Sequence, residues 1–155
     1  MLYRSESKDL VLAATGDSLI TRRLSVYDEP AFLQLFELVR GSDAAFTNLE
    51  MIFHHYEGYP AMESGGTWMQ GDPALLDEML WAGLNLFSVA NNHSLDYSAG
   101  GLLATLRELQ SRRMVCAGAG TNLAEARAPS YLETPAGRVA LLAASSTFAP
   151  FGMAG

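Results

Sequence analysis

The chain has 155 residues, of which 49% are hydrophobic and 17% charged, and its formal net charge is −7. This length and composition predict a single globular domain with its own core and exclude a disordered chain. The excess of 17 acidic over 10 basic residues argues against nucleic acid or an anionic membrane as the main partner. No run reaches the roughly 20 apolar residues that a transmembrane segment needs.

The start of the chain and its single cysteine bear on where the protein works. Residues 1–9 lack the apolar core of a signal peptide, so the sequence as given predicts a soluble cytoplasmic protein. A leader removed from the sequence would instead allow association with the cell envelope. Cys116 has no partner for an internal disulfide, which leaves the redox compartment undetermined.

Short apolar runs alternate with segments of helical period along the chain. Strands are predicted at 10–15, 44–47, 84–90 and 114–117, and helices at 30–40, 73–81, 101–112 and 122–127. Two further strands, at 130–134 and 138–144, flank a Pro-Ala-Gly turn and predict a hairpin. Strands that alternate with helices imply βαβ units, so the predicted class is α/β, a layered and mainly parallel sheet with flanking helices.

Residues 52–71 interrupt this alternation because they show neither a helical nor a strand period. The segment contains two histidines and several aromatic residues among glycines. A structureless loop of about this length is uncommon in a compact domain and often forms a lid or a binding loop. The alternative is a surface excursion whose aromatic side chains pack back on the core, and the sequence leaves both open.

Polar side chains follow three of the predicted strands. Asp17 comes after the first strand, Glu50 after the second, and the run Ala-Asn-Asn-His-Ser-Leu-Asp at 90–96 after the third. Ligands of open α/β sheets bind at the carboxyl ends of the strands, so these groups should converge at one edge. Carboxylate, amide and imidazole groups suit a divalent metal. Each could instead be an ordinary turn former or helix cap.

Three stretches carry a further signal: Thr-Gly-Asp at 15–17, Thr-Asn-Leu-Glu at 47–50, and Leu-Trp-Ala-Gly-Leu-Asn-Leu-Phe-Ser-Val-Ala-Asn-Asn-His-Ser-Leu-Asp-Tyr at 80–97. Together they resemble the bacterial capsule-synthesis family linked to poly-γ-glutamate, which looks like a branch of the calcineurin-like metallophosphoesterases. The resemblance covers nearly the whole chain. It implies a metallophosphoesterase-like fold and a metal-dependent hydrolase that acts on an anionic polymer or a small-molecule ester.

The resemblance also implies roles for individual residues. Asp17, Glu50 and Asn92 would be metal ligands, with Glu50 in the place of the bridging acid. His93 would be the candidate general acid, and Asp96 would orient its ring. The implied cofactor is a divalent metal, with Mn²⁺ favoured and Fe²⁺, Zn²⁺ or Mg²⁺ as alternatives.

The chain departs from the metallophosphoesterase pattern at two points. That superfamily carries Asp-x-His after its first strand, where this sequence has Asp-Ser-Leu at 17–19, and no histidine follows His93. The resemblance therefore predicts half of the full fold, a domain at 1–155 truncated at its C-terminus, with weak metal binding and little turnover. The last strand, at 138–144, would then expose an unpaired edge, through which we expect self-association.

Two alternative functions remain at this point. Residues 16–19 spell the Gly-Asp-Ser-Leu signature of an esterase class in which Ser18 would be the nucleophile. Such an enzyme needs a histidine base, normally within Asp-x-x-His, and no aspartate lies three residues before any of the three histidines. The other alternative is a non-catalytic binding or scaffold domain of a surface-polymer assembly.

Overall fold

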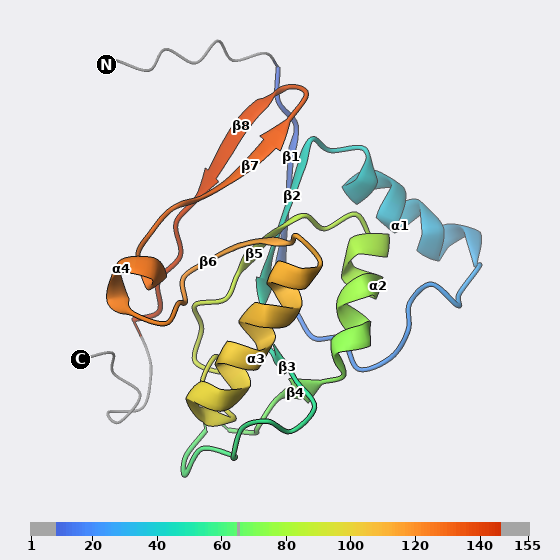
Figure 1. Cartoon of the computed structure of the whole chain (residues 1–155). Helices are drawn as coiled ribbons and strands as arrows, with labels where there is room; N and C mark the ends of the chain where they lie inside the picture. Colours follow the sequence, from blue (N-terminus) through green and yellow to red (C-terminus); the bar gives the residue numbers. More distant parts are fainter. Residues whose placement is uncertain (1–8, 65, 147–155) are drawn as a thin grey trace, which may run out of the picture.

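A computed structural model of the chain describes residues 9–64 and 66–146, so residues 1–8, on which the signal-peptide prediction depends, lie outside the described part (Figure 1). A four-stranded sheet forms the centre, and all its strands are parallel. Its order is β1 (Leu12–Ser18), β2 (Ala44–Leu49), β5 (Leu86–Ser88) and β6 (Val115–Ala117). The predicted α/β class with a parallel sheet is confirmed.

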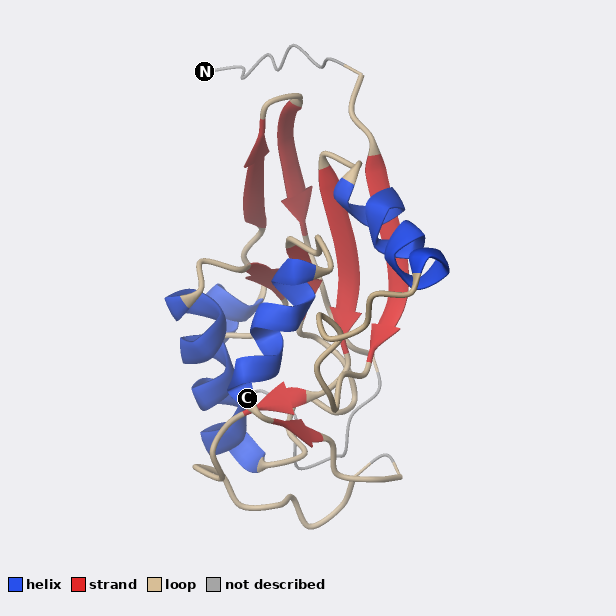
Figure 2. Cartoon of the chain, turned by 90° about the vertical axis from the view of Figure 1, so that its right-hand side faces the viewer, coloured by secondary structure: helices blue, strands red, loops and turns tan. Residues whose placement is uncertain are grey.

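Three helices cover the same face of this sheet (Figures 1 and 2). They are α1 (Pro30–Arg40), α2 (Leu76–Trp81) and α3 (Ser98–Ser111). The strand order follows the chain order, and right-handed crossovers then place every connecting helix on one side. A fourth, short helix, α4 (Leu123–Ala126), follows β6. Among the helices of the described residues, none has the length and apolar character that a transmembrane span requires.

The core lies between the sheet and these helices. Phe87 from β5, Leu76 from α2 and Leu109 from α3 are completely buried and belong to one hydrophobic cluster. The strand β1 is the least covered, because within the described part of the chain it has a neighbour on one side only, and Leu12 is 52% exposed. The sheet is therefore well covered at β2 and β5 and open at its β1 edge.

Several predicted boundaries are wrong by a few residues. The first strand runs to Ser18 instead of ending at residue 15, so Asp17 lies inside it, after an irregularity in the register between Ala14 and Asp17. The helix predicted at 73–81 begins as a 3₁₀ turn, η1 (Pro73–Leu75), whose first residues are capped by Asp72 accepting from the Ala74 amide. The helix α3 starts three residues earlier than predicted, at Ser98.

The segment at 52–71 is not free of strand structure. Its two ends form β3 (Ile52–Phe53) and β4 (Gln70–Gly71), which pair in parallel and close the intervening residues into a loop. The predicted hairpin is present as β7 (Ser130–Thr134) and β8 (Gly137–Leu141), antiparallel and separate from the main sheet. Among the described residues β8 has a neighbour, β7, on one side, and the expectation of self-association through an exposed edge stays a prediction.

Candidate functional site

The carboxyl ends of β1 and β2 bring Asp17 and Glu50 to a shared amide. Asp17 lies opposite Asn48 in the register of the two strands, just after the irregularity that re-aims this part of β1. Asn48 and Glu50 are two residues apart and so face the same side. The Nδ2 group of Asn48 donates to Oδ1 of Asp17 at 2.8 Å and also to Oε2 of Glu50.

Glu50 is the electrostatic centre of this group. Its side chain is 13% exposed, and its Oε1 lies 3.8 Å from Nε2 of His93. Burial, followed by the negative charge of Asp17, raises the pKa of Glu50 above its ordinary value, although His93 and the hydrogen bond from Asn48 oppose this. Glu50 therefore retains its proton more readily than an exposed glutamate does.

His93 and Asp96 form a buried pair next to Glu50. Nδ1 of His93 lies 2.8 Å from Oδ2 of Asp96, and the two side chains are 6% and 1% exposed. The same carboxylate oxygen accepts a hydrogen bond from the main-chain amide of Met69 at 2.6 Å. If Nδ1 carries the proton that Asp96 accepts, Nε2 is left to face Glu50. This is the orientation that a histidine needs to move a proton at its other nitrogen.

The two adjacent asparagines at the end of β5 differ in their surroundings. Nδ2 of Asn91 donates to the carbonyl of Leu49 at 2.8 Å and to Oδ1 of Asn48 at 3.2 Å, and its own Oδ1 accepts from the amide of His93. Asn92 is exposed to solvent. The structure thus joins Asn91, rather than Asn92, to the strand ends.

Four of the five residues predicted for the site are consequently linked. Asp17, Glu50, His93 and Asp96 follow one another through contacts of at most 3.8 Å or through the Asn48 amide. Sequence reasoning missed the connecting role of Asn48 and Asn91. For Asn48 a signal was present, because its spacing of two residues from Glu50 puts both on one side of an extended strand.

The residue types at this site are suitable ligands for a divalent cation, but they do not make up a complete set of ligands. Two carboxylates near one another and near an imidazole are suitable ligands. The pKa of Glu50 is raised first by burial and then by the negative charge of Asp17, and a cation would relieve the second of these. Within residues 9–64 and 66–146, however, no group of three or more His, Cys, Asp or Glu side chains is arranged to hold a metal ion. The hydrogen bonds of Asn48 also occupy oxygens of both acids.

Ser18, the nucleophile of the esterase alternative, lies on β1 beside this group. Its hydroxyl hydrogen-bonds to the hydroxyl of Thr47. The ring of His93 contacts Asp96 and Glu50 instead. The serine–histidine contact that this alternative needs is therefore not formed by His93.

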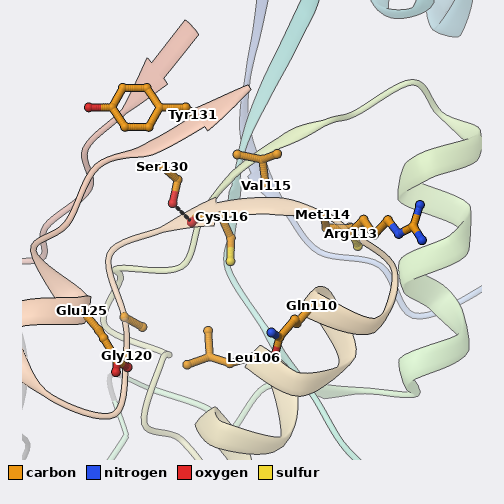
Figure 3. Close-up of a pocket in the computed structure, with 11 residues that line it drawn as sticks. Leu106, Gln110, Arg113, Met114, Val115, Cys116, Gly120, Glu125, Ser130 and Tyr131 are labelled. Carbon is orange, nitrogen blue, oxygen red and sulfur yellow. Dashed lines mark hydrogen bonds between the residues drawn. The ribbon is translucent and has the colours of Figure 1, made fainter. Parts of the chain in front are cut away.

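A separate hollow of about 420 Å³ lies between α3, β6 and β7 (Figure 3). Cys116 lines it, and burial raises the pKa of this thiol, which keeps it protonated and unreactive. The hydroxyl of Ser130 donates to the carbonyl of Cys116 and fastens the start of β7 to β6. None of the predicted site residues lines this hollow.

Comparison with known proteins identifies the family. The profile of the bacterial capsule synthesis protein family PGA_cap matches residues 11–153. The chain belongs to the PGA_cap family. It is also 36% identical over 146 residues to two proteins of Sinorhizobium fredii (strain NBRC 101917 / NGR234), the uncharacterized proteins y4sH and y4uA. The match covers 92% of this chain but 32% of each relative, so this PGA_cap chain spans about a third of their length.

Proposed function

We propose that this PGA_cap domain is a metal-dependent hydrolase related to the metallophosphoesterases, working in the synthesis of capsule polymer or poly-γ-glutamate. The observation that supports this proposal is the position of Glu50. It is joined to Asp17 through one amide, lies 3.8 Å from His93, and has a raised pKa. Side chains whose pKa is shifted by burial and neighbouring charges are concentrated at functional sites.

In this proposal the acids and an amide hold the cation, and the histidine handles a proton. Asp17, Glu50 and Asn92 would supply oxygen ligands, for which Mn²⁺ is the favoured ion and Fe²⁺, Zn²⁺ or Mg²⁺ are alternatives. A cation bound there supplies activation of a water molecule for attack on an ester. In its doubly protonated form His93 would give the Nε2 proton to the leaving group, while Asp96 accepts from Nδ1–H and fixes the ring.

The substrate and partners belong to the same proposal. The substrate is an anionic polymer or a small-molecule ester, and the place of action is the cytoplasm, or the cell envelope in a form that carries a leader. Copies of the chain would associate through an exposed sheet edge, for which the outer side of β8 and the uncovered side of β1 are the candidates. Sedimentation over a wide concentration range tests this association, and a strict monomer would contradict it.

Calorimetric titration with Mn²⁺ tests the metal proposal. We expect weak binding whose heat disappears in both Asp17→Ala and Glu50→Ala, because each removes a charged ligand. Asp28→Ala, a change at an exposed carboxylate, is the matched control and should leave the heat unchanged. Binding curves that are identical in the wild type and in both site variants would show that the two acids are structural.

A non-catalytic binding or scaffold domain is the second candidate. It is favoured by the Asn48 amide, which donates to both acids and so satisfies them in the absence of a cation. A wild-type chain that gives no heat with any of the four divalent ions would support this candidate over the hydrolase.

A further inference from the structure

A small groove opens directly beside the candidate site. It has a volume of about 280 Å³ and is lined by Leu19, Thr21, Met51, Trp68, Met69 and Gln70. Leu19 lies two residues after Asp17, and Met51 directly follows Glu50. The main-chain amide of Met69 donates to Asp96. The walls of the groove are therefore the immediate neighbours of three site residues.

The far wall of the groove is held in place by the segment between β3 and β4. The main-chain amide of Ala61 donates to the carbonyl of Asp96 at 2.8 Å, and Ser98 donates its hydroxyl proton to the carbonyl of Tyr59. A Cβ atom at Gly58 would lie only 2.1 Å from the carbonyl oxygen of Tyr97, so this backbone contact requires glycine. The segment is thus fastened across residues 96–98 and not loosely attached.

Trp68 presents a fixed ring to the groove. Its Nε1 group donates to the carbonyl of Ala61 at 2.9 Å, and the residue remains 44% exposed. The polar atom of the indole is therefore satisfied within the segment, while its apolar surface faces the groove and solvent. An indole whose N–H is already bonded within the segment and whose ring is partly exposed is suited to stacking on a flat ligand group.

We propose that this groove binds an uncharged ring in the leaving group of the ester substrate. The inference rests on the proposed hydrolase function and narrows its substrate to a small ester. The six lining side chains among the described residues are uncharged in a chain of net charge −7, so these residues offer a polyanion no cationic partner. The groove's volume of about 280 Å³ exceeds the roughly 150 Å³ cavity known to bind benzene, so one ring fits within it.

The test uses benzyl alcohol, a neutral single-ring probe, and the whole chain with ¹³C-labelled methionine methyl groups, in the absence of metal. We expect saturable NMR shifts at the methyl groups of Met51 and Met69. The methyl groups of Met79 and Met114, which are buried away from the groove, should not move. Trp68→Ala should weaken binding by about fivefold, the loss expected for one stacking contact.

Tyr131→Ala is the matched control, because Tyr131 is a comparably exposed aromatic residue on β7 outside the groove, and it should bind the probe as the wild type does. Absent shifts at Met51 and Met69, or equal affinity in Trp68→Ala and the wild type, would overturn the proposal. Stronger shifts with a γ-glutamyl oligomer than with benzyl alcohol would also overturn it, in favour of a polymer. Because the NMR experiment contains no metal, its result does not depend on whether the Mn²⁺ titration succeeds. A failure of the groove proposal can therefore be told apart from a failure of the metal proposal.

Discussion

Asp96 accepts two hydrogen bonds at one carboxylate oxygen, from the ring of His93 at 2.8 Å and from the main chain of Met69 at 2.6 Å. The side chain is 1% exposed, so neither donor has water as a replacement partner. One buried aspartate thus holds the imidazole and the end of the 54–69 segment at the same time.

We predict that Asp96→Ala lowers the free energy of unfolding by about 2–4 kcal/mol, because it leaves two buried donors unsatisfied. The neutral ring of His93 should also lose its preference for the Nδ1–H tautomer. Urea denaturation measures the first effect, and ¹⁵N NMR of the imidazole measures the second. In the exposed control Asp28→Ala neither quantity should change. A change in stability alone would show that Asp96 does not orient the ring.

The raised pKa of Glu50 predicts that Glu50→Gln stabilises the fold at pH 7. A folded-state pKa above the unfolded value means that a favourable contribution is present below the unfolded pKa and is lost as pH rises through the folded one. In Glu50→Gln the side-chain amide carries no charge, so the penalty for burying a carboxylate at pH 7 disappears, and its oxygen still accepts from Asn48. The melting temperature should therefore rise at pH 7 and rise less at pH 4.

Glu63→Gln, at an exposed position, should show no such gain at either pH. Glu50→Gln should also lose the Mn²⁺ heat, because a neutral amide is a poorer ligand. A variant that is more stable than the wild type but no longer binds Mn²⁺ would show that Glu50 is kept for function and lowers the stability of the fold. A Glu50→Gln variant that is less stable than the wild type at pH 7 would contradict the raised pKa of Glu50.

His54 should make the fold sensitive to acid. It is completely buried, both ring nitrogens lack a hydrogen-bond partner among the residues that the structure describes, and burial lowers its pKa, although Glu57 at 3.7 Å opposes this. The unfolded chain then takes up the proton first, so stability falls as pH drops below the ordinary value near 6.5.

We predict that His54→Phe reduces the loss of unfolding free energy between pH 7.5 and pH 5.5. The phenyl ring keeps the edge contacts with Tyr56 and Tyr97 and cannot be protonated. The neighbouring His55 is exposed, and its charge is the last of the causes that lower the pKa of His54, after burial. His55→Phe should therefore alter the pH dependence much less than His54→Phe. Parallel stability curves for the wild type and His54→Phe would show that another group accounts for the acid sensitivity.

The adjacent asparagines give a paired prediction. Asn91→Ala should lower the free energy of unfolding by about 1–3 kcal/mol, because the amide of His93 and the carbonyl of Leu49 lose their partners. Asn92→Ala, at an exposed position, should change stability by less than about 0.5 kcal/mol. Mn²⁺ heat lost in Asn92→Ala would support its role as a ligand, and heat retained there would remove Asn92 from the site.

Much of the architecture could be predicted because hydrophobic period and turn residues determine it locally. The helix at 30–40 and the hairpin strand at 130–134 have the predicted bounds, and the parallel order follows from alternating strands and helices. The end of β1 could not be predicted, because the run of small residues around Gly16 has no clear period and its register irregularity depends on β2.

The candidate site was predictable at the level of strand ends and not of individual contacts. Parallel strands end at one edge, which brings Asp17 and Glu50 together. The choice between Asn91 and Asn92 depends on the conformation of the turn in which both lie, and the sequence does not determine it. The pairing of β3 with β4 is non-local and only two residues long, so no period announces it.

The bond from position 69 to Asp96 comes from the main chain, and this has an evolutionary consequence. Every residue type except proline supplies that amide, so natural variation at position 69 can alter the groove wall without disturbing the aspartate–histidine pair. The residue type at position 69 would then vary among relatives, although its main-chain amide is needed to hold Asp96. Among substitutions at this position, only Met69→Pro would remove the hydrogen bond to Asp96, because proline has no amide hydrogen. Related proteins could therefore differ in what the groove binds and still keep His93 and Asp96.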